Sequence, residues 1–300
     1  MLFAIKNQFI MKNEINSHFG FKKDFFTEVP LSGENLERFV NQTEPLKKLA
    51  LSLQMKRNCG IIGGFGSGKS SFLRKLEQIL ISKGIFAKYF QVNLPIDDYN
   101  RTRLVFLRST LRNILVLILQ NKSLRDSFTM LIDEFDKIGR KDLSSPQWDK
   151  QLLQVLELTR EIMNTEKLLF TFSLQEELYG KLQDARQGKG DSSLLGLIND
   201  YEKLNDFNAD YALQVVEKAI ECSGYPNDIS TLFAPDIIEA IHRDCNGKVR
   251  LFVHEMIELI QQAYLDGKKQ IDKDVFIKCL RKKWDNLSTE KFGEHVKSLF

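Results

Sequence analysis

GGFGSGKS, residues Gly63–Ser70, is the most informative segment of this sequence. It fits the pattern G-x-x-x-x-G-K-[ST] and lies between the apolar run NCGII (58–62) and an amphipathic stretch over about 69–83. A loop that wraps a polyphosphate with backbone amides needs positions without side chains, and the helix that follows adds free N–H groups and partial positive charge. The sequence therefore predicts a phosphate-binding loop between a buried strand and a helix.

The residues of this loop have separate expected tasks. Lys69 is expected to reach the β- and γ-phosphates of ATP, and the Ser70 hydroxyl is expected to bind Mg2+. The nucleotide contacts are expected from one continuous segment: Gly63, Gly64, Phe65, Gly66, Ser67, Gly68, Lys69, Ser70 and Ser71. ATP and Mg2+ are therefore the predicted cofactors. The alternative is a glycine-rich loop that precedes a helix by chance.

A second group of candidate site residues ends the apolar run SFTMLI (127–132). Because ligands of open α/β sheets bind at the carboxyl ends of the strands, Asp133 is expected beside the phosphates, holding Mg2+ through a water molecule. Glu134 is expected to orient or deprotonate the attacking water, which a hydrolase needs more than a small-molecule kinase does. Asp136 is the alternative to Glu134, and the acidic run could also only cap a strand.

Alternating apolar and amphipathic stretches predict an α/β domain followed by helices. Besides NCGII and SFTMLI, strands are expected at FAKYFQVNL (86–94) and LLFTFS (168–173). Helices are expected over 44–56, 101–120, 147–164 and 175–182, an exposed loop over 185–193, and C-terminal helices over 209–223, 234–244, 248–266, 272–283 and 288–299. The expected organisation is an irregular N-terminal extension (1–43), an α/β domain with a parallel sheet flanked by helices (44–205), and a small all-helical domain (206–300).

Composition and charge leave a nucleic-acid partner open. The net charge of +3 neither demands nor excludes one, so local clusters must decide. The four cysteines lie far apart, which favours free thiols in a reducing cytosol over a structural zinc site. The longest apolar run, ILVLIL (114–119), is far shorter than the roughly 20 residues that span a bilayer. A cytoplasmic protein without a membrane partner is expected.

Together with LLFTFS and the tail NGKVRLFVHEMIELIQQAYLDGKKQIDKDVF (246–276), these motifs resemble the AAA+ class of P-loop ATPases over about residues 40–285. The resemblance implies that LLFTFS lies between the strand before the loop and the strand before Asp133. It also implies a polar sensor residue at the end of LLFTFS. Ser173 is the best match, with Thr171 as the alternative, although asparagine or threonine is more frequent there. The helical tail would then be a lid, and Arg250 a second sensor for the γ-phosphate. Its alternative is an arginine that faces solvent.

Weaker similarities point to one branch of that class. LIDEFDKI (131–138) is similar to the acidic strand of origin-recognition ATPases. FGFKKDFFTEVP (19–30) resembles the FGL-x-x-x-PF opening of ExeA-like ATPases, with Phe25 in place of the proline. The tail pattern GKVR…IDKDVF is similar to the lid of transposon-encoded AAA+ regulators. These similarities imply a switch or loader that hydrolyses ATP in association with DNA.

A single arginine and a set of three arginines are candidates for contacts with partners. Arg186 is the candidate finger that would complete a neighbour's site in an oligomer, or else only a loop arginine. Arg101, Arg108 and Arg112 are spaced by seven and four, so they share one stripe of the expected helix 101–120. Such a stripe suits the phosphates of double-stranded DNA, although it could also be a solvated face. The first hypothesis is a DNA-associated ATPase that works with a protein partner or as a homo-oligomer. The alternative is a signalling or defence-complex ATPase that acts through a protein partner without DNA.

Overall fold

The chain folds into two compact units. The computed structural model describes residues 2–27, 29–91, 128–134, 168–184 and 198–300, together with Val116 and Gln120. One unit, called here the α/β unit, comprises Gln42–Phe65 and Lys69–Leu204. The other, called here the helical unit, comprises Met1–Asn41, Gly66–Gly68 and Asn205–Phe300. The N-terminal segment and the C-terminal helices therefore belong to one unit.

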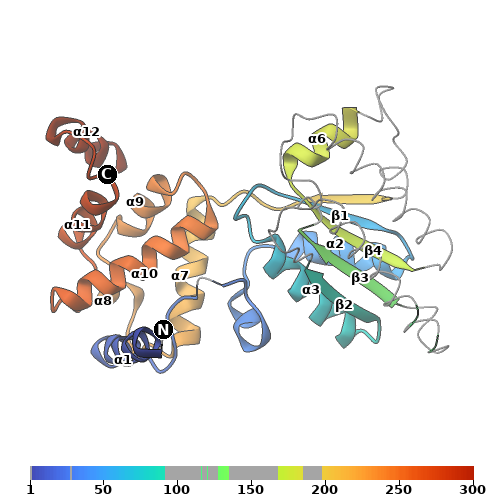
Figure 1. Ribbon diagram of the computed structural model, residues 1–300, viewed down its shortest axis with the longest axis horizontal. Helices are drawn as coiled ribbons and strands as arrows, with labels where there is room; N and C mark the ends of the chain where they lie inside the picture. Colours follow the sequence, from blue (N-terminus) through green and yellow to red (C-terminus); the bar gives the residue numbers. More distant parts are fainter. Residues whose placement is uncertain are drawn as a thin grey trace. The chain divides into compact units, whose positions relative to one another are not determined.

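The α/β unit is built on a parallel five-stranded sheet with the order β2-β3-β4-β1-β5 (Figure 1). The strands are β1 (Cys59–Ile62), β2 (Phe86–Gln91), β3 (Phe128–Asp133), β4 (Leu169–Leu174) and β5 (Asp200–Lys203). Every residue of β3 and all but the first of β4 are buried, which accounts for their uninterrupted apolar runs. The expected parallel α/β fold is confirmed, and β4 lies between β1 and β3 as the resemblance implied.

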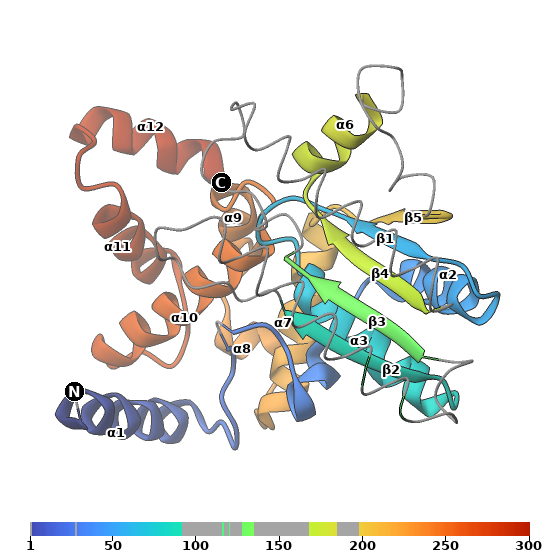
Figure 2. The ribbon, with the colours of Figure 1, turned by 45° about the vertical axis from the view of Figure 1, so that its right-hand side comes forward.

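Three helices of the described residues belong to this unit: α2 (Thr43–Gln54), α3 (Lys69–Ser82) and α6 (Glu176–Asp184). Helix α3 buries Phe72, Leu73, Leu76 and Leu80, whose spacing places them on one face. That face packs on β2, β3 and β4, and α2 packs on β1 and β5 while also contacting α3 (Figures 1 and 2). The first residue of α3 is Lys69, so this packing fixes the helix end that follows the glycine-rich loop.

Strand β5 is the one strand of the described sheet that the sequence analysis missed. Its residues, DYEK, carry no apolar alternation, and the strand pairs with β1 alone among the described strands. Such an edge strand is held mainly by backbone hydrogen bonds, which leave no apolar pattern in the sequence. Its presence explains Gly60, because a Cβ at that position would lie 2.6 Å from the Tyr201 ring.

Several predicted features lie outside the described residues. They are the helix over 147–164, the loop over 185–193, Asp136, and the arginines Arg101, Arg108, Arg112 and Arg186. Of the predicted helix 101–120, only Val116 and Gln120 are described, and both are helical.

The helical unit contains α1 (Leu2–Phe19), the 3-10 helix η1 (Gly33–Arg38), α7 (Ala209–Ser223), α8 (Ile229–Leu232), α9 (Ile237–Asp244), α10 (Val249–Leu265), α11 (Lys273–Lys283) and α12 (Thr289–Leu299). The C-terminal helices follow the predicted ranges, except that the helix expected from 234 begins at Ile237 and short α8 precedes it. Side-chain caps explain these sharp starts, since Asn208 accepts from the Tyr211 N–H at 2.9 Å and Asp272 from the Val275 N–H at 3.0 Å. No helix in the described part of the chain is long and apolar enough to cross a membrane.

The N-terminal segment is not irregular throughout, because it contains α1 and η1, and for these two helices the prediction is wrong. Helix α1 runs beside α10 (Figure 2), and the residue after its end, Gly20, has a φ of +84°, which favours glycine. Beyond it, Phe19 stacks on Phe21 and Phe21 on Phe25, with ring centroids 5.4 and 5.0 Å apart. These rings are buried in the core of the helical unit. Phe25, which departs from the proline of the resembling family, is therefore a core residue.

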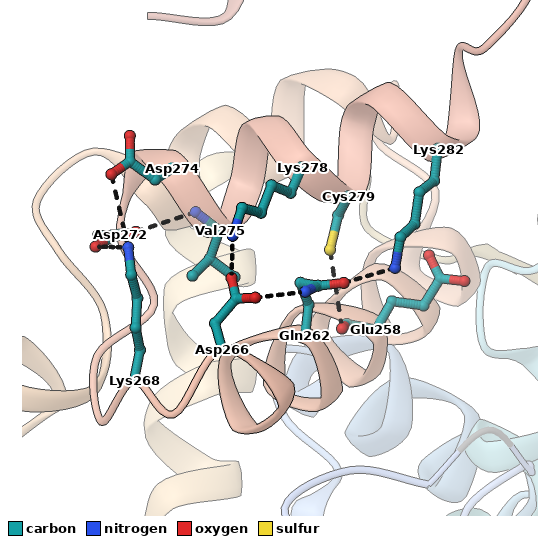
Figure 3. Close-up of polar contacts among 10 residues, drawn as sticks. All are labelled: Glu258, Gln262, Asp266, Lys268, Asp272, Asp274, Val275, Lys278, Cys279 and Lys282. Carbon is teal, nitrogen blue, oxygen red and sulfur yellow. Dashed lines mark hydrogen bonds and ion pairs between the residues drawn. The ribbon is translucent and has the colours of Figure 1, made fainter.

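Polar contacts tie α10 to α11 (Figure 3). Asp266 accepts from Lys278 at 2.8 Å and from Gln262 at 2.9 Å, while Lys282 donates to Gln262 at 2.6 Å. The basic residues on this side of α11 are thus partnered by side chains of the neighbouring helix.

We expect Phe25→Ala to lower the free energy of unfolding of the helical unit by about 3–5 kcal/mol, the range for removing a buried phenylalanine. Phe25 is 4% exposed, whereas nearby Val29 is 64% exposed, so Val29→Ala is the matched control. Urea denaturation followed by circular dichroism measures both. Equal midpoints for the two variants would contradict the assignment of Phe25 to the core.

Candidate nucleotide-binding site

The glycine-rich loop leaves the end of β1 with its backbone open. The Gly63 N–H donates to the Leu174 carbonyl at 3.2 Å, which ties the start of the loop to the end of β4. Gly66 and Gly68 have φ of +75° and +92°, a region that residues with side chains rarely adopt. A Cβ added to Gly64 or Gly68 would meet no heavy atom of the described residues within 4 Å. The glycines therefore allow both the turn and the close approach of a ligand to the backbone.

The polar side chains of the loop fit a phosphate group. The Lys69 ammonium donates to the carbonyls of Gly63 and Gly64, at 2.8 Å each, so its charge lies against the start of the loop. The Ser67 hydroxyl is buried and has no hydrogen-bond partner among the described residues. Such a group requires a partner to offset its lost hydration. Ser70 and Ser71 are half-buried in the first turn of α3, where free N–H groups favour an anion.

Asp133, the last residue of β3, is a buried carboxylate with three hydrogen-bond donors. It is 1% exposed. Its Oδ1 accepts from the Ser173 hydroxyl at 2.7 Å and from the Glu134 N–H at 2.9 Å, and its Oδ2 accepts from the Tyr89 hydroxyl at 2.7 Å. A buried charge is tolerated when it is hydrogen-bonded in this way. The donors come from three neighbouring strands or their ends, so the order β2-β3-β4 assembles the group.

Glu134, the next residue, has a backbone conformation that few residues other than glycine adopt. Its φ is +56°, a left-handed conformation that costs on the order of 1–3 kcal/mol in a residue other than glycine. Its N–H donates to both Asp133 Oδ1 and Ser173 Oγ at 2.9 Å, and its Oε2 accepts from the Gln91 amide at 3.1 Å. Ser173 and Asp133 therefore hold the turn that sets the direction of the Glu134 side chain.

Tyr89 and Gln91 are site residues that the sequence analysis missed. Strand β2 pairs with β3 so that Gln91 lies opposite Asp133. Tyr89 is two residues earlier, and alternate residues of a strand point to the same face. This spacing within FAKYFQ was the available signal, but its meaning depends on the register. Burial and then the charge of Asp133 raise the pKa of the Tyr89 hydroxyl, so it remains a donor at neutral pH.

The structure separates the two candidates for the polar sensor residue. The Ser173 hydroxyl lies between Asp133 and Glu134. The Thr171 hydroxyl, two residues earlier on β4, is buried without a hydrogen-bond partner among the described residues. Of these two candidates, Ser173 and not Thr171 contacts the acidic pair.

Arg250 lies at the second position of α10 and is exposed. Within the helical unit, which includes Gly66–Gly68, a Cβ added to Gly66 would lie 3.0 Å from the Arg250 Cβ. Together with its positive φ, this contact explains why position 66 is a glycine.

We expect Ser173→Ala to lower the free energy of unfolding of the α/β unit by about 1–3 kcal/mol, because it removes a buried hydrogen bond to the carboxylate of Asp133 and another from the Glu134 N–H. Thr171→Val is the matched control on the same strand. Since the described residues offer the Thr171 hydroxyl no partner, replacing it should be neutral or stabilising. Chemical denaturation measures both variants, and an equal loss in each would argue against the Ser173 network.

Comparison with known proteins supports the fold. No family model matches the sequence, and no curated protein is significantly similar to it. The RuvB Holliday junction branch migration motor of Thermotoga maritima superposes with a TM-score of 0.52 at 15% identity, covering 85% of this chain and 72% of RuvB. The ORC2 protein of Aeropyrum pernix, in its ADPNP–ADP complexes, superposes with a TM-score of 0.56 at 14% identity, covering 88% and 71%. The chain has the fold of the AAA+ P-loop ATPases, an α/β unit with a parallel sheet followed by a small set of helices.

Proposed function

We propose that this protein binds and hydrolyses Mg·ATP and uses its nucleotide state as a switch in association with DNA. One observation carries the proposal. The loop after β1, Ser173 on β4 and the pair Asp133–Glu134 after β3 lie at the carboxyl ends of three adjacent parallel strands. That edge of an open α/β sheet is where ligands bind. A glycine-rich loop at one strand end and a held acidic pair two strands away are the two halves that an NTP hydrolase needs.

In this proposal Lys69 exchanges the carbonyls of Gly63 and Gly64 for oxygens of the β- and γ-phosphates. The hydroxyl of Ser70 and the carboxylate of Asp133 hold Mg2+, which neutralises charge on the phosphates. The first turn of α3, including Ser71, and the loop from Gly63 to Gly68 supply backbone N–H donors.

Glu134 is the residue that acts on the attacking water. Its carboxylate orients the water and accepts a proton from it. The left-handed turn at Glu134 is held by two acceptors, so the carboxylate is oriented by the fold before substrate binds. Ser173, by holding both acidic residues, couples the end of β4 to this step. Arg250, at the start of α10, would report the γ-phosphate to the helical unit, which then acts as a lid.

The association with DNA rests on the arginine stripe and on likeness to a DNA motor. RuvB is described as a Holliday junction branch migration motor, and this chain shares its fold. Arg101, Arg108 and Arg112 remain the candidate contacts to DNA. The basic residues of α11 are less suited to this role, because Lys278 and Lys283 are partnered by Asp266 and Asp244.

That pairing favours a second candidate function, a signalling or defence-complex ATPase that acts through a protein partner. In it the helical unit binds protein and not nucleic acid. Both candidates share the same nucleotide chemistry, and they differ only in whether duplex DNA is bound directly.

We expect Glu134→Gln to bind ATP with near-native affinity and to hydrolyse it about 100-fold more slowly or worse, as for the loss of a positioned base. The amide keeps the shape of the side chain but takes no proton. Lys69→Ala is the contrasting variant, in which binding itself should be lost. Nucleotide titration and phosphate release distinguish the two. Unimpaired hydrolysis in Glu134→Gln would move the role to Asp136.

Replacing Arg101, Arg108 and Arg112 together with alanine should weaken binding to random duplex DNA and leave ATP affinity intact. Each lost phosphate contact lowers the slope of log affinity against log salt by about 0.9. Fluorescence anisotropy of a labelled duplex across a salt series measures the slope. An unchanged slope would favour the protein-partner function.

A further inference from the structure

The acceptor sites of Asp133 can be counted one by one. Each oxygen of an ionised carboxylate has two lone pairs. Oδ1 uses both, for the Ser173 hydroxyl and the Glu134 N–H. Oδ2 uses one, for the Tyr89 hydroxyl at 2.7 Å. The contacts among the described residues therefore leave a single lone pair for a metal ion or its water, and Tyr89 determines which lone pair that is.

The hydroxyl of Tyr89 is itself held in place. The Arg74 guanidinium lies 4.4 Å from the centre of the Tyr89 ring, and the Tyr89 N–H donates to Glu77 at 2.9 Å. Pairing of Tyr89 with Leu131 fixes the height of the residue along the sheet. The donor that meets Asp133 is thus fixed through its ring and through its backbone on both sides.

Without this donor, the carboxylate would be held through Oδ1 alone. Both lone pairs of Oδ2 would then be available to the metal ion. The position of Oδ2 could also change, because the carboxylate could rotate about its bond to Cβ. A metal ligand that is fixed by an outer hydrogen bond binds better than one that must first be ordered.

We propose that Tyr89 is a positioning residue for the Mg2+ site, which orients Asp133 Oδ2 toward the ion bound with ATP. The inference rests on the proposed function and adds to it a residue of β2 that belongs to neither nucleotide motif. Tyr89 does not touch the nucleotide in this role. It acts only through Asp133.

The test is the Mg2+ dependence of nucleotide affinity in Tyr89→Phe. Phenylalanine keeps the ring beneath Arg74 and removes only the hydroxyl. With a fluorescent ATP analogue as probe, the Mg2+ concentration for half-maximal gain in affinity should rise about 10-fold or more, the usual effect of losing an outer-shell partner. Affinity in EDTA should change by less than about twofold, because the loop and Lys69 are untouched, and excess Mg2+ should restore the wild-type affinity.

Tyr225→Phe is the matched control, since it removes a tyrosine hydroxyl of the helical unit whose hydrogen-bond partner among the described residues is Thr231, at 2.9 Å. Thermal melting of each variant shows whether it is folded. Affinity in EDTA is a second control, because a misfolded site would lose affinity without Mg2+ as well. If the wild type gains no affinity from Mg2+, the proposed function fails. If the wild type responds to Mg2+ and Tyr89→Phe follows the same titration, the proposed function stands and the role of Tyr89 is overturned.

Discussion

The buried carboxylate of Asp133 links the polar site of the α/β unit to the order of its strands. At 1% exposure it has lost nearly all contact with water, and an unpaired charge there would cost several kcal/mol. Its three donors come from Tyr89 on β2, Ser173 on β4 and the backbone turn at Glu134. Any strand order that removed β2 or β4 from the sides of β3 would take away one of these side-chain donors. The polar site and the sheet order therefore stabilise each other.

The helical unit buries charge by the same principle, with a different set of partners. Asp244 accepts from Lys283 at 2.6 Å and from His295 at 2.8 Å. Burial alone would raise the pKa of Asp244, but these bonds outweigh it and hold the pKa below its ordinary value. Glu255, also bonded to Lys283, has its pKa raised by burial and then by the charge of Asp244. One lysine thus serves two carboxylates from different helices, which ties α9, α10 and α11 together.

The predictable parts of this structure are those in which the local backbone conformation or burial requires one type of residue. A glycine-rich loop needs positive φ and open backbone, and a parallel strand buried on both sides needs an unbroken apolar run. Both requirements are visible in the sequence at Gly63–Ser70, at β3 and at β4. Strand β5 has no such requirement, because backbone pairing with β1 holds it. Helix α1 buries Ile15 and Phe19 against helices more than 190 residues further along the chain. Tyr89 and Gln91 gained their place only from the register of β2 against β3.

That dependence on register explains how the AAA+ fold can be shared at 14–15% identity. The chemistry requires only a few groups at the carboxyl ends of adjacent strands, and the apolar cores behind them tolerate replacement when volume and pattern are kept. Phe25 illustrates the point, since an aromatic ring that stacks on Phe21 occupies the position of a proline in the resembling family. A donor to the buried carboxylate is likewise defined by position and not by motif. Any residue of β2 whose side chain brings a hydroxyl to the carboxylate of Asp133 would satisfy Oδ2. Here Tyr89 does so from the position opposite Leu131, two residues before Asp133.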